Sequence, residues 1–375
     1  MHNKQMTSDR YIGLISGTSM DGIDAVVIDF ANSRPELCAA ITAEYCNDLR
    51  DALDGLRADP DAFPAARLAR LDAEVADAFA DAAQQVLAAA GLPPAEVRAI
   101  GSHGQTVLHR PDESPPHTLQ IGDPSRIAAG CGIDVVGDLR RADLAAGGQG
   151  APLAPLIHAA LLADPDEHRI VVNLGGIANI TVLANGRVSG FDTGPANCFL
   201  DVWYRAHHEE RFDAGGRWAA DGRVDDALLD RLMADPYIRR PPPKSTGIEY
   251  FSPAWLRERL TDAADQRPAD IQATLAEFST ASLVENLRAH GPERIDRVLL
   301  CGGGTANTDL IARLRRRLGD IEVQSTAEFG IDPDFVEATL IAWLAREFIE
   351  GRAVDTPPIT GASRPVRLGA LWPGR

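Results

Sequence analysis

The order of apolar runs and glycine turns repeats in the two halves of the chain. The runs, each about the length of one strand, lie at residues 11–16, 23–30 and 37–43 in the first half and at 169–174, 177–183 and 187–191 in the second. A glycine-bearing turn separates the first two runs in each half, at Gly17–Gly22 and at Gly175–Gly176, and Asn185–Gly186 predicts a tight hairpin before the last run. We therefore predict that each half opens with three antiparallel strands joined as a meander.

Helices and further strands are predicted around these two meanders. A helix fits 65–90 and is closed by Gly91. The other predicted elements are strands at 97–101, 133–137, 297–301 and 321–324, helices at 198–207 (opening near Pro195), 309–318 and from Asp332-Pro333 through 349, and a loop at 239–249. At 375 residues the chain is long enough for two domains. We expect an α/β protein with a first domain over 1–137, completed by 355–375, and a second over 138–354.

Charge and cysteine content exclude several classes of protein. A net charge of −17 leaves no basic footprint of the kind that nucleic acid or an anionic membrane surface requires. The five cysteines form no CxxC pair and no zinc-like spacing, which predicts reduced thiols in a reducing compartment. The first ten residues hold no apolar segment of the signal-peptide kind, and no stretch approaches the length of a spanning helix. We expect a cytoplasmic protein without nucleic-acid or membrane partners.

Three glycine-rich turns follow the first strands of predicted β-units and are candidate phosphate-binding sites. Gly17-Thr18-Ser19-Met20-Asp21-Gly22 joins two strands, whereas a Walker A loop opens a helix and carries GxxxxGK[ST]. Such a hairpin loop can still direct backbone N–H groups and hydroxyls at phosphate oxygens. Gly175-Gly176 and Gly302-Gly303-Gly304 add two places where backbone can approach a ligand without interference from Cβ atoms. An ordinary β-turn is the alternative for the Gly17–Gly22 loop, and each of the three sites is a weak signal when taken alone.

Asp192 is the candidate catalytic base. It ends the third strand of the second meander, within Gly190-Phe191-Asp192-Thr193-Gly194-Pro195. A helix N-terminus nearby would keep its carboxylate ionised, and an ionised carboxylate can take a proton from water or a hydroxyl beside a γ-phosphate. The alternative is a helix N-cap or turn aspartate.

Other polar residues follow predicted strand ends or lie on an apolar helix face. Arg140 offers a planar fork for a carboxylate or phosphate, although without context a solvated pair of arginines is the more common case. A lone histidine such as His103 is more often structural than catalytic. Glu337 shares a helix face with three apolar residues, Ile341, Leu344 and Phe348. We predict that this carboxylate is paired, lies near the helix mouth or is used in a site. The alternative is a first-turn glutamate that the helix dipole favours.

Taken in order, short segments of the chain resemble the anhydro-N-acetylmuramic acid kinase family. The matching segments are GLISGTSMDGID (13–24), GSHGQT (101–106), LQIGDP (119–124), GDLRRADLAAGGQGAP (137–152), VNLGGIANIT (172–181), GFDTGPAN (190–197), PPKSTG (242–247), QATL (272–275), CGGGTAN (301–307) and TGA (360–362). They span nearly the whole chain. Ala196 stands where the family more often has glycine.

The resemblance implies a fold, a reaction and a set of site residues. The fold is the two-domain, actin-like ATPase fold with ribonuclease H-like domains, and the glycine turns face each other across a nucleotide cleft. The reaction opens 1,6-anhydro-N-acetylmuramic acid with water and phosphorylates O6 from ATP, with Mg²⁺ expected. Asp192 would be the base. The implied ATP-binding residues are Gly17, Thr18, Ser19, Met20, Asp21, Gly22, Ile23, Asp24, Gly175, Gly176, Gly302, Gly303 and Gly304, and the implied sugar-side residues are His103, Gln105, Arg140 and Glu337. The resemblance also implies a homodimer, and it names no metal ligand.

Two other readings of the same residues remain open. A hexose or acetate kinase would use Asp192 on an ordinary acceptor hydroxyl. A sugar-sensing regulator or filament-forming ATPase would bind nucleotide without phosphorylating a metabolite, but a regulator of this kind should carry a basic DNA-binding segment, which the sequence lacks.

Overall fold

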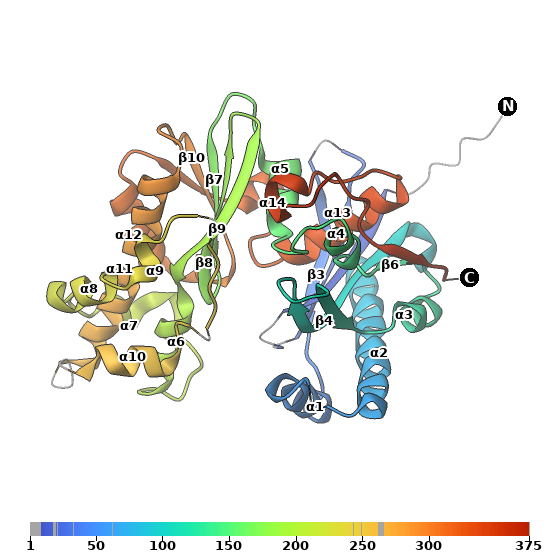
Figure 1. Cartoon of the computed structure of the whole chain (residues 1–375), viewed down its shortest axis with the longest axis horizontal. Coiled ribbons are helices and arrows are strands. Elements are labelled where there is room, and N and C mark those ends of the chain that lie inside the picture. Colours follow the sequence, from blue (N-terminus) through green and yellow to red (C-terminus); the bar gives the residue numbers. More distant parts are fainter. Residues whose placement is uncertain are drawn as a thin grey trace. The chain divides into compact units, whose positions relative to one another are not determined.

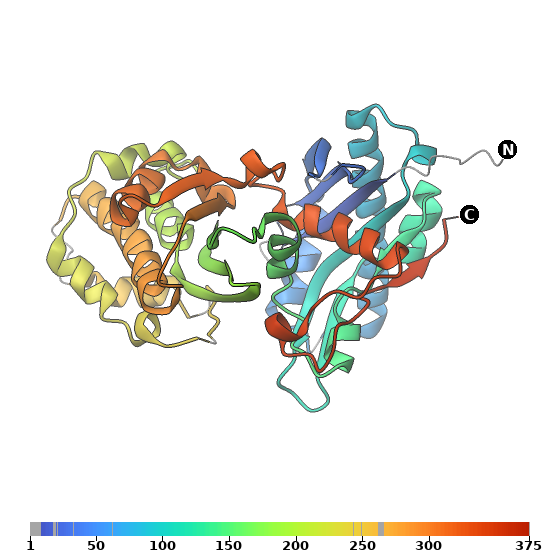
Figure 2. The same ribbon diagram turned by 90° about the horizontal axis from the view of Figure 1, so that it is seen from above.

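The chain divides into two compact units, shown in two views of a computed structural model (Figures 1 and 2). The structure describes residues 9–17, 20, 22–32, 34–61, 63–242, 244–248, 250–261 and 266–374. Unit 1 consists of Met1–Ile157 with Gly330–Arg375, and unit 2 is His158–Phe329. The first division thus falls later than the predicted 137/138 boundary, and the C-terminal return to unit 1 begins earlier than residue 355.

Unit 1 is built on a mixed sheet in the order β12-β6-β4-β1-β2-β3, with β5 paired to β4. Its strands are β1 Arg10–Ser16, β2 Ile23–Asp29, β3 Glu36–Ala43, β4 Ala99–Arg110, β5 His117–Ile121, β6 Val135–Gly137 and β12 Ala370–Trp372. Its helices are α1 Asn47–Ala58, α2 Ala65–Ala90, α3 Pro124–Cys131, α4 Arg141–Ala145, α13 Val336–Ile349 and α14 Pro357–Thr360. Helix α5, Ala154–Leu162, runs across the division between the units.

Unit 2 is built on a five-stranded sheet in the order β11-β10-β7-β8-β9. Its strands are β7 Arg169–Leu174, β8 Ile177–Ala184, β9 Arg187–Pro195, β10 Arg297–Cys301 and β11 Glu322–Ser325. Its helices are α6 Asn197–Arg205, α7 Arg217–Ala220, α8 Asp226–Met233, α9 Pro236–Arg239, α10 Pro253–Arg259, α11 Pro268–His290 and α12 Thr308–Leu318.

The two sheets repeat one topology. In each unit the first three strands pair antiparallel, and the fourth strand pairs parallel with the first, so that β3-β2-β1-β4 corresponds to β9-β8-β7-β10. One more parallel strand extends each sheet beyond this shared part: β6 pairs with β4 in unit 1, and β11 pairs with β10 in unit 2. This is the ribonuclease H-like strand order. The repeated meander and the actin-like two-domain fold predicted from the sequence are therefore confirmed.

Two glycines explain why the C-terminal segment belongs to unit 1 from residue 330 onward. A Cβ on Gly13 of β1 would overlap the carbonyl oxygen of Ala338, and one on Gly101 of β4 would overlap that of Ile341. Helix α13 thus packs directly on the two central strands. Ile12 and Leu14, which alternate with Gly13 along β1, pack in the cluster that includes α2, so helices cover both faces of this sheet.

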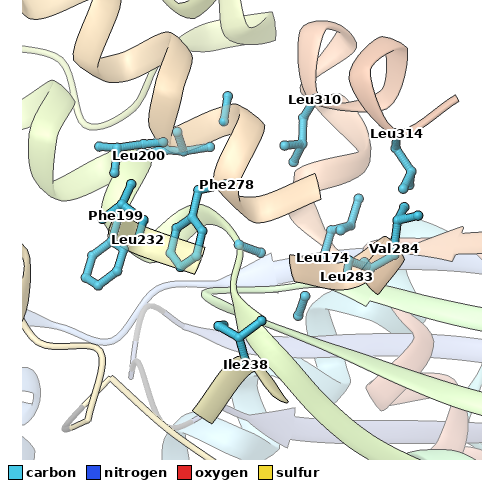
Figure 3. Close-up of a cluster of buried hydrophobic side chains, with 14 of the residues drawn as sticks. Leu174, Phe199, Leu200, Leu232, Ile238, Phe278, Leu283, Val284, Leu310 and Leu314 are labelled. Atoms are coloured by element: carbon cyan, nitrogen blue, oxygen red, sulfur yellow. The ribbon is translucent and has the colours of Figure 1, made fainter. Parts of the chain in front are cut away.

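Unit 2 has its own apolar core, centred on α11 (Figure 3). Phe278 and Leu283 of this helix are buried, as are Phe199 of α6 and Leu310 of α12. Because α11 has buried residues on nearly every side, it lies inside the unit rather than on its surface.

Several predicted boundaries are corrected by the structure. Strand β4 continues past residue 101 to Arg110 because β5 pairs with its second half, so His103 lies inside a strand rather than after one. Strand β9 includes Pro195, and α6 begins at Asn197. Helix α13 begins at Val336 rather than at Asp332-Pro333, since the Asp332 side chain accepts from the Asp334 N–H and forms a turn there.

Candidate active site

The Gly17–Gly22 loop joins two antiparallel strands of unit 1, as predicted. Ile15 of β1 and Asp24 of β2 are register partners across it. A Cβ on Gly22 would lie 2.8 Å from the carbonyl oxygen of Ala43, so only glycine fits without displacing β3. Asp24 accepts a hydrogen bond of 2.7 Å from Thr42. The side chains of Met20 and Ile23 are buried in the unit 1 core, so these two predicted ATP-binding residues can offer a ligand only backbone.

Three of the predicted ATP-binding residues, Thr18, Ser19 and Asp21, lie outside the described residues. The start of their loop is supported by Gln105. This fully buried side chain donates from Nε2 to the Gly17 carbonyl at 3.2 Å. Gln105, predicted to contact the sugar, thus supports the Gly17–Gly22 loop of the same unit.

Arg140 and His103 form a hydrogen-bonded pair in unit 1. Arg140 Nε donates to His103 Nε2 at 2.8 Å, while His103 Nδ1 lies 3.0 Å from the Gly104 carbonyl. The first contact requires Nε2 to accept, so the proton belongs on Nδ1, which donates to that carbonyl. Burial, reinforced by the Arg140 charge, lowers the pKa of His103 to about 3. His103 is therefore a neutral acceptor that orients the Arg140 fork.

A second support for Arg140 comes from the GGQG segment. Arg140 Nη1 donates to the Gly150 carbonyl at 2.6 Å, and the Gly150 N–H donates to Asp143 at 2.7 Å. Asp143 is fully buried and also accepts from Thr360 Oγ1 at 2.9 Å. Residue-by-residue reading did not select Asp143 or Thr360 as site residues. Their signal was available, because both lie in segments that carry the family resemblance.

Glu337 is electrostatically coupled to Arg140. Loss of hydration near the surrounding protein raises the pKa of Glu337, and the Asp24 carboxylate raises it further. The Arg140 cation opposes this rise. The Glu337 side chain is exposed, in the first turn of α13. Burial lowers the pKa of Arg140, and Glu337 opposes this effect. The structure thus brings together, in unit 1, the predicted sugar-side residues Arg140, His103 and Glu337.

The Gly175–Gly176 turn of unit 2 lies against the start of α6. Both of its carbonyls accept from backbone N–H groups there: Asn197 donates to Gly175 at 3.1 Å, and Ala196 and Cys198 donate to Gly176 at 2.9 and 3.1 Å. With these carbonyls engaged, the groups that the turn can offer to a phosphate are its N–H groups.

The Gly302–Gly304 segment packs beside the same turn. Gly302 has φ of 84°, and a Cβ on it would overlap Asn173 Oδ1. A Cβ on Gly304 would lie 2.6 Å from Leu174 Cβ and 2.9 Å from Asn197 Nδ2. A Cβ on Gly303 would meet no atom within 4 Å. Gly302 and Gly304 are therefore required by packing, whereas Gly303 borders open space.

Asp192 lies on β9, and among the described residues it makes hydrogen bonds to Thr246, Lys244 and Tyr237. Its Oδ2 accepts from the Thr246 N–H at 2.9 Å, its N–H donates to the Lys244 carbonyl at 3.3 Å, and its carbonyl accepts from Tyr237 Oη at 3.0 Å. The residue that precedes α6 as its N-cap is Ala196, so the N-cap alternative for Asp192 is wrong. The side chain is half-buried. A fixed, partly accessible carboxylate is suited to act as a general base.

No metal cluster or membrane helix is found among the residues that the structure describes. No three His, Cys, Asp or Glu side chains are grouped to hold a metal ion. No described helix is both long and apolar enough to cross a bilayer.

Two ribonuclease H-like units with glycine turns after their first strands define a protein of the actin-like ATPase and sugar kinase class. The family model for anhydro-N-acetylmuramic acid kinase matches residues 9–374. The chain belongs to this family.

Relatives named anhydro-N-acetylmuramic acid kinase match along the whole chain. The protein of Xanthomonas campestris pv. campestris (strain 8004) is 51% identical over 370 residues, which is 98% of each chain. That of Shewanella amazonensis is 43% identical over 98% of this chain and 100% of its own. A solved structure with a more distant likeness is a ROK family glucokinase from Streptomyces griseus in complex with glucose and AMPPNP. Its TM-score is 0.39 at 16% identity, with 90% of this chain and 99% of that one covered.

Proposed function

We propose that this chain is an ATP-dependent kinase that opens 1,6-anhydro-N-acetylmuramic acid and phosphorylates O6. The products are N-acetylmuramate 6-phosphate and ADP, and the reaction belongs to cell-wall recycling. The observation that carries this proposal is the family match over residues 9–374, with relatives up to 51% identical along the same length.

In this reaction Asp192 takes a proton from a water molecule, whose oxygen bonds to the anomeric carbon C1. The C1–O6 bond of the anhydro ring breaks, and O6 takes the γ-phosphoryl group of ATP. The bond from the γ-phosphorus to ADP breaks as the bond to O6 forms. One carboxylate and the electrophilic γ-phosphoryl group thus replace the two carboxylates of a glycosidase. The contact from the Thr246 N–H supports this role, since it fixes the Asp192 carboxylate on β9.

The remaining site residues divide between the nucleotide and the sugar. We assign the glycine turns at 17–22, 175–176 and 302–304 to the ATP phosphates, and Arg140, His103 and Glu337 to the sugar side. Arg140 suits the lactyl carboxylate of the sugar because a guanidinium binds a carboxylate through two parallel hydrogen bonds.

Mg²⁺ is expected with ATP, since it neutralises charge on the transferred phosphoryl group. Magnesium in kinases is usually held by one or two carboxylates together with phosphate oxygens and water, so a three-residue cluster is not needed. Asp24, at the end of the Gly17–Gly22 loop, offers a carboxylate of this kind. We also propose a cytoplasmic enzyme that forms a homodimer.

The activity is tested by giving purified protein ATP and a panel of sugars, with ADP release as the measurement. Anhydro-N-acetylmuramic acid should give turnover, and mass spectrometry should find a product heavier than the substrate by one water and one phosphoryl group. Turnover on glucose or acetate but not on the anhydro sugar would favour the hexose or acetate kinase reading. ADP release without a phosphorylated metabolite would favour the sensor or filament reading.

The site is tested by Asp192→Asn, which keeps the size of the side chain but removes the base. Turnover should fall by a factor of about 10²–10⁴. ATP binding, followed by calorimetry, should persist because the assigned phosphate turns are elsewhere in the sequence. Asp226→Asn, an exposed position in the first turn of α8, is the matched control. Near-normal turnover of the Asp192 variant would move the base to another residue, and Glu337 would be tested next.

A further inference from the structure

Lysine is rare in this chain, and one of its two lysines is buried. Of 37 basic residues only Lys4 and Lys244 are lysine, so the other 35 are arginine. Lys4 lies outside the described residues. Lys244 is 6% exposed, although lysine is among the residues least often buried. A chain that otherwise uses arginine therefore has a lysine at a position where the cation lies inside the protein.

The surroundings of Lys244 suit a compact ammonium group. Its Nζ donates to the carbonyls of Tyr237 and Ile238, at 3.2 Å each, and lies 4.7 Å from the centroid of the Tyr237 ring. The centroid of the Phe191 ring lies 5.9 Å from the same cation. An ammonium can bridge two adjacent carbonyls as a point charge, whereas a guanidinium is a larger planar fork. These contacts tie Lys244 to the end of α9.

The same residues enclose the backbone of Asp192. Lys244 Nζ donates to the Tyr237 carbonyl, Tyr237 Oη donates to the Asp192 carbonyl, and the Asp192 N–H donates to the Lys244 carbonyl. These three hydrogen bonds form a closed ring of three residues. Thr246 lies two residues after Lys244, and its N–H donates to Asp192 Oδ2. The position of Thr246, and so of the carboxylate, depends on where Lys244 is anchored.

We propose that Lys244 is a positioning residue for the catalytic base. Its ammonium anchors residues 244–246 on α9, so that the Thr246 N–H keeps the Asp192 carboxylate in one orientation toward the water that it activates. This inference rests on the proposed function, in which Asp192 is the base. Lys244 itself does not touch the reacting atoms.

The charge of Lys244 should make this positioning dependent on pH. Burial, and then the Arg240 cation, lower the pKa of Lys244 to about 8, while the Asp192 carboxylate raises it. The groups that act on this ammonium are therefore Asp192 on β9, Tyr237 on α9, and Arg240. Burial and the Asp192 charge raise the pKa of Tyr237, so the phenol stays neutral where Lys244 titrates. Lys244 is charged below about pH 8 and loses its proton above it, which weakens the anchor on the two carbonyls.

The first measurement needs no variant. In the wild-type protein kcat should decrease as pH rises through about 8, whereas KM for both substrates should change little. A kcat that stays level from pH 7 to 9.5 would overturn the proposal.

The second measurement uses Lys244→Met, which keeps the length of the side chain but removes the charge and the donors. Its kcat should fall by about 10–100-fold, the size of effect expected when a catalytic group is displaced by about 1 Å. Both KM values should stay within about threefold of the wild type, and the decrease of kcat through pH 8 should disappear. Arg239→Met, at an exposed cation of α9 that pairs with Glu285, is the matched control and should behave as wild type.

Two results separate this inference from the proposed function. If Asp192→Asn abolishes turnover but Lys244→Met does not change kcat, Lys244 has no positioning role while the base remains assigned. If Asp192→Asn retains turnover, the assignment of the base itself fails.

A Lys244→Met protein that melts at a lower temperature, and that loses kcat while keeping the alkaline decrease, would show a merely structural lysine and would also overturn the proposal. Lys244→Arg, which keeps the charge, should recover part of kcat.

Discussion

At the scale of single residues, Arg140, which we propose to bind the sugar, is positioned by its neighbours in unit 1. Arg140 donates through Nε to His103 and through Nη1 to the Gly150 carbonyl. His103 is neutral, so its ring nitrogen accepts a hydrogen bond from the Arg140 cation without repelling it. The orientation of the guanidinium therefore depends on a buried network that includes Asp143 and Thr360.

Arg140→Ala should weaken binding of the sugar more than binding of ATP. Removing one partner of a desolvated charge pair typically costs about 2–5 kcal/mol, and the lactyl carboxylate of the sugar is the proposed partner. Titration calorimetry with each ligand measures the two affinities separately. Arg141→Ala is the matched control, because the neighbouring side chain is 57% exposed and lies 3.7 Å from Asp138. Unchanged sugar affinity in the Arg140 variant would remove this residue from the site.

At the scale of elements, the glycine turns differ in what requires the glycine. Gly302 adopts a left-handed φ and leaves no room for a Cβ, so its role is in the fold of the turn between β10 and the residues that follow. A Cβ on Gly303 would meet no atom within 4 Å. The space beside Gly303 is where a bound phosphate could approach the backbone.

The pair Gly302→Ala and Gly303→Ala separates these two roles. Gly302→Ala should lower the free energy of unfolding by about 1–3 kcal/mol, because it combines strain at positive φ with a clash at Asn173. Gly303→Ala should leave thermal stability unchanged and still weaken ATP binding. Differential scanning calorimetry and ATP titration give the two readouts, with Gly55→Ala, in helix α1 with nothing near its Cβ position, as the control. Normal ATP affinity in Gly303→Ala would mean that the nucleotide does not approach this turn.

The elements that could be predicted from the sequence are those whose signal is local. The strands of both meanders and helix α2 have clear apolar patterns and glycine ends, and the structure places them within a few residues of their predicted bounds. Helix α11, which is long but buried on nearly every side and so lacks an amphipathic pattern, was not predicted. Helices α1, α3, α4, α5 and α14 and the short helices α7 to α10 were not predicted either. These short helices contain few residues, so their periodicity is weak, and tertiary contacts such as those of buried Leu228 and Trp255 decide their conformation.

The site was predictable only where a residue carries its own chemical signal. Asp192 and Arg140 could be selected from short motifs, but Lys244 lies in a segment read as a loop, and its burial depends on α9 and β9. Likewise, the packing of α13 on β1 and β4 joins residues far apart in the sequence, and no local pattern reports such a contact. The Asp143–Thr360 bond, between residues 217 positions apart, is of the same kind.

At the scale of the whole molecule, the proposed reaction needs both units. Asp192, Lys244 and the Gly175–Gly176 turn belong to unit 2, whereas Arg140 and Glu337 belong to unit 1. We predict that the turns at 17–22 and 175–176 both contact the phosphates of one bound nucleotide. Exclusion of bulk water around that nucleotide would limit idle hydrolysis of ATP.

The central claim is that water attacks the sugar at C1 while ATP phosphorylates O6, and ¹⁸O-labelled water tests it most directly. Protein, ATP and anhydro-N-acetylmuramic acid are mixed in labelled water for a single turnover, quenched and analysed by mass spectrometry of the sugar phosphate. Unlabelled product incubated in labelled water for the same time corrects for spontaneous exchange at the anomeric carbon. The account predicts one label on C1 and none in the phosphoryl group. Label in the phosphoryl group or in released phosphate, with C1 unlabelled, would contradict it, because water would then attack ATP rather than the sugar.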